Sequence, residues 1–421
     1  MLCYHLGLFM PRAREATAAR GLGNGYSFGG DFYPVWLTSK EWLRARRDPY
    51  GLEMTREIQT GLFGRPLDSA IPTDFTDLRM FAHPAFTALL FWPASGLPFT
   101  VARVVLVVLL AAMTIASVFL WIRALSWHLR WTWLAVVVLL LLFSYPALEG
   151  LYAGQLGLFV AFLLAAAILA LQRGRYLLAG ILMALATIKP QTTLLAILCL
   201  LIWSTHDWRT RNRFFVGFFS TEILLIGFSL AVWPHWISSW LRVAAAYHRY
   251  AKPPLLSEVL SAALGSTLAG PSTFAITGTL LGVVVWLAWR SRKAPASSSG
   301  FWLTLSLALA VTTVTLLPGQ AVYDHVILLP AVLFLARQRR ALRASRTQIT
   351  LMALGAAMIL WPWVSALGLI AFRPFVQQHY SSAILSLPLR TAAAFPFVVL
   401  AMLALARRKK TAVVPDASLP G

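Results

Sequence analysis

Residues 99–122 read FTVARVVLVVLLAAMTIASVFLWI, an apolar run of 24 residues that contains one charge, Arg103. A helix of about 20 apolar residues crosses the hydrocarbon core of a bilayer. Comparable runs recur along the 421 residues, of which 59% are hydrophobic and 12% charged, about half the charged fraction of soluble proteins. This composition excludes a soluble cytosolic enzyme and a disordered or fibrous protein. Because lipid offers no hydrogen bonds to the backbone, the spans must be helical, and the sequence predicts an all-α polytopic membrane protein.

Eleven apolar stretches are predicted to be transmembrane helices. Residues 1–98 precede them as an extracytoplasmic N-terminal segment, residues 99–406 form the transmembrane domain, and residues 407–421 form a basic cytoplasmic tail. The Lys189-Pro190 pair interrupts the stretch 175–205, so one span is the alternative to two there. The predicted spans are residues 99–122, 131–147, 152–172, 175–188, 190–205, 213–233, 272–290, 301–317, 323–337, 347–371 and 384–406.

Every second connection between these spans is short and basic. Nineteen of the 36 Lys and Arg residues lie in such connections or in the tail, with two acids, Asp207 and Asp416. The other side holds 17 basic residues and 12 acids, and Glu222 falls within a span. The net charge of +21 therefore divides into about +17 on one side and about +5 on the other. This asymmetry marks the first side as cytoplasmic, so the charge reports topology and predicts no nucleic-acid partner.

The N-terminal segment is predicted to lie outside, because an odd number of spans ends in a cytoplasmic tail. Its first 30 residues hold three arginines and no run long enough to span, so we expect the natural start to lie upstream, with a twelfth span. Within residues 31–80, Trp36 and Trp42 alternate with basic residues in a helical rhythm. This pattern predicts amphipathic helices on the outer membrane interface. The run Ala85–Leu97 is too short to span.

Polar and ionisable residues gather at the outward ends of the spans. Such residues are costly near a membrane and mark candidate functional sites. A carboxylate there can take a proton from an attacking hydroxyl, while a cation neutralises charge on a departing phosphate. The candidates are Asp31, Asp48, His83, Glu149, Gln155, Lys189, Gln191, Tyr323, Asp324 and His325.

Each candidate also has a purely structural interpretation. Asp31 follows two glycines and fits a helix N-cap. The sequence Asp48-Pro49-Tyr50 is typical of a turn, and Lys189 near a span end fits a snorkelling lysine. His325 fits a core histidine and Glu149 a solvated acid. Their shared side of the membrane is what favours a site.

Other kinds of site have little support in the sequence. Cys3 and Cys199 cannot form a disulfide framework or a metal cluster. Asp74 and Asp77 are spaced too loosely to indicate a metal, and no glycine-rich nucleotide-binding pattern occurs. The sequence therefore predicts neither a metal nor a cofactor.

An ordered set of motifs over about residues 30–337 resembles glycosyltransferase family 87, whose members are integral-membrane transferases of the GT-C type. Where that family often has Tyr-Pro-Pro this chain has His83-Pro84-Ala85, and where it often has Trp-Glu-His this chain has Tyr323-Asp324-His325. The matching motifs are Gly30-Asp31-Phe32-Tyr33, Asp48-Pro49-Tyr50, His83-Pro84, Gly154-Gln155-Leu156-Gly157, Lys189-Pro190 and Tyr323-Asp324-His325.

The resemblance implies a reaction and roles for residues. A hexose, mannose by family analogy, would pass from a polyprenyl-phosphate donor to a hydroxyl of a lipid or glycan acceptor, with inversion, outside the cell membrane. Asp31 would be the general base. Lys189 would contact the donor phosphate, and His325 would position the acceptor or stabilise the phosphate. Tyr33 and the other motif residues are candidates for substrate binding.

Two other classes of protein fit the composition. A polar-lipid or glycolipid flippase would place charged residues near the midplane and show internal repeats, whereas only Glu222 lies within a span and no repeat is present. A scaffold for cell-envelope assembly would not need Asp31, Lys189 and His325 on one side. The sequence therefore favours the transferase.

Overall fold

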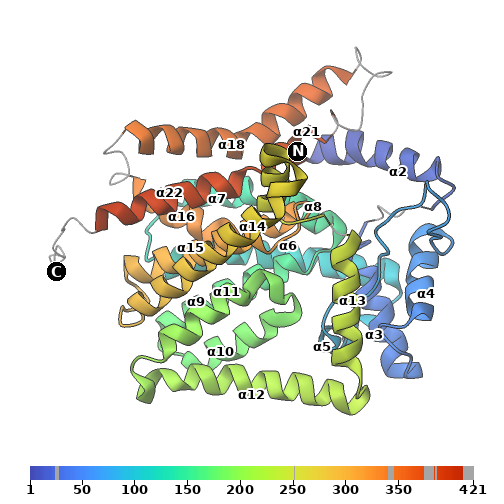
Figure 1. The fold of residues 1–421 in the computed structure, drawn as a ribbon, viewed down its shortest axis with the longest axis horizontal. Helices are drawn as coiled ribbons and strands as arrows, with labels where there is room; N and C mark the ends of the chain where they lie inside the picture. Colours follow the sequence, from blue (N-terminus) through green and yellow to red (C-terminus); the bar gives the residue numbers. More distant parts are fainter. Residues whose placement is uncertain (24–27, 251, 340–345, 374–383, 385, 411–421) are drawn as a thin grey trace.

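The computed structural model describes the chain except residues 24–27, 251, 340–345, 374–383, 385 and 411–421. The described residues form helices throughout, and their only β-type pairing is an isolated bridge between Pro254 and Pro318. This confirms the predicted all-α class. Most of the helices run side by side as a bundle (Figure 1).

The N-terminal segment, residues 1–98, folds into short helices. The predicted amphipathic helix exists as α3, but its apolar face is buried within the protein: Trp42 is fully buried and Trp36 is 9% exposed. The alternation of residues therefore reflects packing against the protein, and contact with the membrane interface stays a prediction. The elements are α1 (Leu2–Tyr4), the π-helix η1 (His5–Phe9), α2 (Met10–Ala18), α3 (Tyr33–Ala45), α4 (Leu52–Phe63), α5 (Ala85–Leu90) and the 3-10 helix η2 (Trp92–Gly96).

Helices also occupy each of the eleven predicted spans. The outer connection predicted at residues 234–271 is largely helical too, because it contains α13 and the start of α14. The elements are α6 (Phe99–Ala124), α7 (Trp131–Leu142), α8 (Tyr145–Ala153), α9 (Gly157–Gln172), α10 (Tyr176–Leu185), η3 (Ala186–Ile188), α11 (Pro190–Ser204), α12 (Trp208–Val232), α13 (Trp236–Tyr250), α14 (Leu255–Ser291), α15 (Ser299–Thr315), η4 (Val322–Leu328), α16 (Leu329–Arg337), α18 (Arg346–Ala371), α21 (Leu387–Ala392) and α22 (Phe395–Lys410).

Four helices among the described residues are long and apolar enough to cross a membrane: α6, α12, α14 and α18. The pair α7 and α8, bent by 56°, makes a fifth if it is counted as one broken span. The other apolar helices, such as α9, α11 and α15, have 10–17 residues. The chain thus has several membrane-spanning helices, whereas the count of eleven stays a prediction.

The break predicted at Lys189-Pro190 is present. Proline disfavours helical dihedrals at the residue before it, and Lys189 has φ −134° and ψ 73° between η3 and α11. The stretch 175–205 is therefore two helices joined at Lys189. The first of these helices, α10, packs closely on α12: Gly180 of α10 lies against the backbone of α12, and Gly217 of α12 lies against α10. Small residues at such positions let membrane helices approach closely.

The two ends of the bundle differ. The short connections between α9 and α10 and between α14 and α15 lie at one end, on the left of Figure 1. Helices α3, α4, α5 and α13 gather at the opposite end, on the right. This arrangement agrees with the alternation of short basic and long connections, and it brings the N-terminal segment and α13 together.

Candidate active site

Asp31 lies in a tight turn immediately before α3. Gly29, with φ 74°, accepts a hydrogen bond from the Phe32 N–H at 3.0 Å, and the Asp31 N–H donates to the Ala153 carbonyl at 2.9 Å. The N-cap of α3 is Phe32, without a side-chain capping bond. Asp31 is therefore not a capping residue, and its carboxylate is available to other elements.

Both carboxylate oxygens of Asp31 accept a bond from a distant residue. Arg79 Nη1, in the loop after α4, donates to Asp31 Oδ1, and Gln155 Nε2, between α8 and α9, donates to Asp31 Oδ2. Arg79 Nε also lies 3.3 Å from Asp77 Oδ2. The Arg79 and Asp31 side chains are each 23% exposed, so solvent reaches this pair.

Gln155 joins Asp31 to a second ion pair. Lys189 Nζ donates to Gln155 Oε1 at 3.3 Å and to Asp324 Oδ1 at 2.7 Å. The side chains of Lys189 and Asp324 are 7% and 1% exposed. Because an ammonium group can only donate, Lys189 requires the amide oxygen on its side and thereby turns the amide NH₂ of Gln155 toward Asp31.

We call these five residues, Arg79, Asp31, Gln155, Lys189 and Asp324, the Asp31 network. Each comes from a different turn, loop or short helix. The Asp31–Arg79 end is reached by solvent, and the Lys189–Asp324 end is buried. A carboxylate held between hydrogen-bond donors is fixed in position and can act as an acceptor of protons.

Two glycines allow the Gly154-Gln155-Leu156-Gly157 motif to reach the network. Gly154 ends α8 with φ 72°, a left-handed conformation that glycine adopts readily. Gly157 begins α9, and a Cβ at this position would overlap Asp324 Oδ1 and lie 3.5 Å from Lys189 Nζ. The motif thus has a turn residue and a close-approach residue on either side of Gln155.

The Asp48 and His83 motifs support the network from outside. Asp48 Oδ1 accepts from the Tyr50 N–H at 2.9 Å, as expected of a turn, and Tyr50 Oη donates to the His83 carbonyl at 2.9 Å. His83 Nδ1 lies 3.1 Å from the Ile188 carbonyl, next to Lys189. Burial lowers the pKa of His83 to about 4. The neutral ring therefore donates from Nδ1 and holds the chain beside Lys189.

The other predicted residues lie around the network or away from it. The Tyr323 ring lies 4.8 Å from Lys189 Nζ in a cation–π contact. His325 is buried on η4, and within the described part of the chain no hydrogen bond joins it to the Asp31 network. Glu149 lies 3.5 Å from His5 Nδ1, and Gln191 is exposed at the start of α11.

Tyr33 lies outside the network. Its ring is 4.8 Å from that of Phe99 and stacks on Trp36, and its hydroxyl lies against Gly61 of α4. Burial raises the pKa of Tyr33. Tyr33 therefore packs α3 against α4 and α6, and its predicted substrate contact stays a prediction.

The sequence interpretation missed Arg79 and Tyr247. Arg79 was one of many arginines in the N-terminal segment, and its spacing from Asp77 is unremarkable. Tyr247 lies on α13, where burial, followed by the negative charges of Asp77 and Asp31, raises its pKa to about 12. These charges act on Tyr247 because α13 packs near Asp31, a proximity that no sequence pattern indicates.

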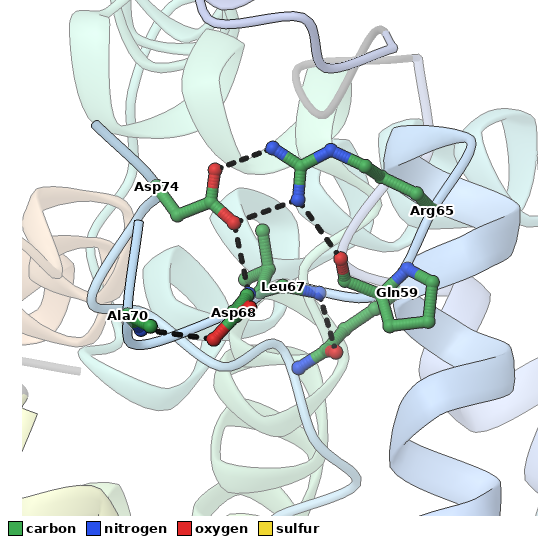
Figure 2. Close-up of polar contacts among 7 residues, drawn as sticks. Gln59, Arg65, Leu67, Asp68, Ala70 and Asp74 are labelled. Atoms are coloured by element: carbon green, nitrogen blue, oxygen red, sulfur yellow. Dashed lines mark hydrogen bonds and ion pairs between the residues drawn. The ribbon is translucent and has the colours of Figure 1, made fainter. Parts of the chain in front are cut away.

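A second carboxylate in the N-terminal segment, that of Asp74, has both of its oxygens bound by an arginine. Figure 2 shows Asp74 bound by Arg65 through two parallel bonds of 2.6 and 2.7 Å, while the Asp68 N–H donates to Asp74 Oδ2 at 2.9 Å. The Arg65 hydrogen bond is the main cause that lowers the pKa of Asp74 to about 2. Asp74 thus orders its loop, and within the described residues no group of three His, Cys, Asp or Glu is placed to hold a metal.

A cavity of about 280 Å³ lies between the Asp48 turn and α13. Asp48 and Tyr50 line one side, and Ser239 and Arg242 of α13 line the other. Arg242 donates to Ser239 Oγ at 3.0 Å. The cavity therefore combines an aromatic ring, a carboxylate, a hydroxyl and a guanidinium.

The model of glycosyltransferase family 87 matches residues 81–318, more than half of the chain. The matched range contains His83, Gln155 and Lys189, whereas Asp31 and the Tyr323-Asp324-His325 motif lie outside it. No curated protein and no solved structure matches the chain.

Proposed function

Because the chain belongs to glycosyltransferase family 87, we propose that it transfers a hexose, specifically mannose, from a polyprenyl-phosphate donor to a hydroxyl of a lipid or glycan acceptor. The reaction takes place on the extracytoplasmic face with inversion, and Asp31 is the general base. The membership supports a membrane glycosyltransferase. Mannose, the polyprenyl-phosphate donor and inversion rest on the resemblance to the family, the extracytoplasmic face rests on the asymmetry of basic residues, and the general base rests on the placement of Asp31.

The observation that carries the proposal is the placement of Asp31. Its carboxylate is reached by solvent and is bonded to Arg79 on one oxygen and Gln155 on the other. A carboxylate of this kind can take a proton from an acceptor hydroxyl, and a cation beside it can neutralise charge on a leaving phosphate. Both requirements of displacement from a sugar phosphate are therefore met within one cluster.

The proposed step balances without a further reactant. The acceptor oxygen attacks the anomeric carbon, and the bond from that carbon to the donor phosphate oxygen breaks. The hydroxyl proton passes to a carboxylate oxygen of Asp31, and polyprenyl phosphate leaves with the electron pair. Because phosphate is a good leaving group, no general acid is required.

The cavity beside Asp48 and α13 is the proposed place of the acceptor. At about 280 Å³ it is near the lower end of ligand-pocket volumes, and its polar groups suit a hydroxylated ring. Arg242→Ala is expected to raise the KM for the acceptor by about tenfold while the KM for the donor stays unchanged. Equal changes in both would place the acceptor elsewhere.

The proposed function is tested by reconstitution in vesicles with polyprenyl-phosphate mannose and a membrane lipid extract. Wild-type protein should release polyprenyl phosphate and form a mannosylated product, and Asp31→Asn should reduce the rate by about a hundredfold or more. Asp74→Asn is the matched control in the same segment, because Asp74 is bound by Arg65 away from Asp31. Equal turnover of wild type and Asp31→Asn would show that Asp31 is not the general base. Movement of the donor across the vesicle membrane without bond formation would favour a flippase.

A further inference from the structure

The two cations of the Asp31 network differ in how firmly their charge is neutralised. Lys189 is 7% exposed and bonded at 2.7 Å to Asp324, which is 1% exposed. Separating this pair would leave an uncompensated buried charge, which is strongly unfavourable. Arg79, by contrast, is 23% exposed and pairs with carboxylates that are 23% and 45% exposed. Its ion pairs are the ones that can be exchanged.

Guanidinium and ammonium groups also differ in how they bind phosphate. A guanidinium presents several donors in a fixed plane that matches carboxylate and phosphate oxygens alike. Arg79 uses Nη1 for Asp31 and Nε for Asp77, so the same donors that now bind carboxylates suit a phosphate. Its backbone has φ 49°, a conformation that is rare for residues other than glycine. The position of Arg79 is thus held by its surroundings.

We propose that Arg79 is the phosphate-binding cation of this site and that it exchanges Asp31 for the phosphate of the donor when the donor binds. The inference rests on the proposed function and deepens it, because it assigns the phosphate to Arg79 where the resemblance assigns it to Lys189. Lys189 and Asp324 then serve to orient Gln155. In the donor-free protein Arg79 covers Asp31 Oδ1, and in the donor complex that oxygen is free to receive the acceptor proton.

The exchange couples two requirements of the reaction. Asp31 becomes available as a base when a phosphate is present to bind Arg79. The negative charge that Asp31 offers to Arg79 is replaced by that of the phosphate, so the guanidinium remains neutralised throughout. After transfer, polyprenyl phosphate departs, and Arg79 returns to Asp31.

Binding of polyprenyl monophosphate to the full-length protein in phosphatidylcholine nanodiscs tests the proposal. Arg79→Gln is expected to weaken binding by about tenfold or more, while binding of the uncharged polyprenol is unchanged. Arg79→Lys should restore part of the loss. Arg65→Gln is the matched control, because Arg65 forms an ion pair in the same segment with Asp74, away from Asp31. Equal affinities of wild type and Arg79→Gln would overturn the proposal.

A double-mutant cycle tests the exchange itself. Asp31→Asn should tighten binding of polyprenyl monophosphate by about threefold or more because it releases Arg79. If this gain depends on Arg79, it disappears in the Arg79→Gln background. A gain of equal size in both backgrounds would reflect loss of a negative charge alone and would overturn the exchange.

Two further measurements identify the source of the phosphate and separate the two proposals. Inorganic phosphate should compete with polyprenyl monophosphate in wild type but not in Arg79→Gln, whereas phosphatidylglycerol in the nanodisc should leave binding unchanged. Competition by phosphatidylglycerol at the same site would assign Arg79 to a lipid headgroup and overturn its donor role. In turnover, Arg79→Gln should raise the donor KM more than it lowers kcat. An inactive wild type refutes the transferase, whereas an active wild type with an unchanged donor KM in Arg79→Gln refutes only this inference.

Discussion

Two of the arginine–aspartate pairs in the N-terminal segment, Arg65–Asp74 and Arg79–Asp31, have different roles. Arg65 and Asp74 are nine residues apart and bind each other through two parallel bonds. Arg79 and Asp31 are 48 residues apart, and Asp31 continues to Gln155, 124 residues away. The first pair closes a loop on itself (Figure 2). The second collects elements from across the fold, and this difference separates a structural ion pair from a candidate site.

We expect the largest effect from breaking the buried ion pair of the Asp31 network, Lys189–Asp324. Lys189→Met leaves Asp324 buried without a partner, and we expect the free energy of unfolding to fall by about 3–5 kcal/mol. Replacing both residues, as in Lys189→Met with Asp324→Leu, should recover most of this loss. Denaturant titration in detergent measures both. A single variant as stable as wild type would show that the pair is not the buried anchor of the network.

The second largest effect is expected from removing Gln155, which links Asp31 to the Lys189–Asp324 pair. Gln155→Leu leaves the Lys189–Asp324 pair intact but removes the amide that fixes Asp31, and kcat should fall by about 10- to 100-fold. Gln172→Leu is the matched control, because Gln172 donates to the Ala296 carbonyl, away from the site. Similar kcat values for Gln155→Leu and wild type would disconnect Asp31 from the buried pair.

A methyl group at position 157 tests the close approach of Gly157 to Asp324. Gly157→Ala introduces a Cβ that overlaps Asp324 Oδ1, so the Asp324 carboxylate must shift, its bond to Lys189 is disturbed, and the rate should fall by about tenfold. Gly227→Ala on α12 is the control, since no heavy atom lies within 4 Å of its added Cβ. Initial rates of purified variants decide the matter, and equal rates for both alanine variants would contradict the close approach.

Removing the Arg65–Asp74 ion pair should give the smallest effect. The pKa of Asp74 is lowered in the folded protein to about 2 from 3.8, so its stabilisation is present above pH 3.8 and is lost as the pH falls through 2. Asp74→Asn should therefore lower the thermal midpoint slightly at pH 7 and leave activity unchanged, and the two proteins should converge near pH 2. A loss of turnover in Asp74→Asn would show that both pairs serve the site.

Part of this molecule follows from local patterns. The Lys189-Pro190 break is predictable because proline restricts the residue before it, and α3 is predictable because Trp36 and Leu43 are seven residues apart, at helical spacing, with charged residues between them. That spacing shows that an apolar face exists without showing what covers it. We expected the apolar face of α3 to contact the membrane interface, whereas the structure buries Trp36 and Trp42 within the protein. Hydropathy likewise locates apolar helices, but α9, α11 and α15 are too short to fix how many of them cross.

The candidate site was predictable only in part. Gln155, Lys189 and Asp324 were found because they are polar residues at the ends of apolar runs, and Asp31 was found because it belongs to a motif of family 87. Arg79 and Tyr247 were not found, because an arginine in a charged loop and a tyrosine on an amphipathic helix have no distinguishing pattern. Their place beside Asp31 depends on how α13 and the loop after α4 pack at one end of the bundle.

By itself the sequence determined the helical membrane class, the asymmetry of charge between alternate connections and the resemblance to family 87, because these depend on composition, periodicity and short motifs. Only the tertiary structure decided which polar residues meet. Lys189 and Asp324 are 135 residues apart, and Asp31 reaches Arg79 and Gln155 from separate elements. Such contacts are set by the packing of whole helices, and packing determined that the cation beside Asp31 is Arg79.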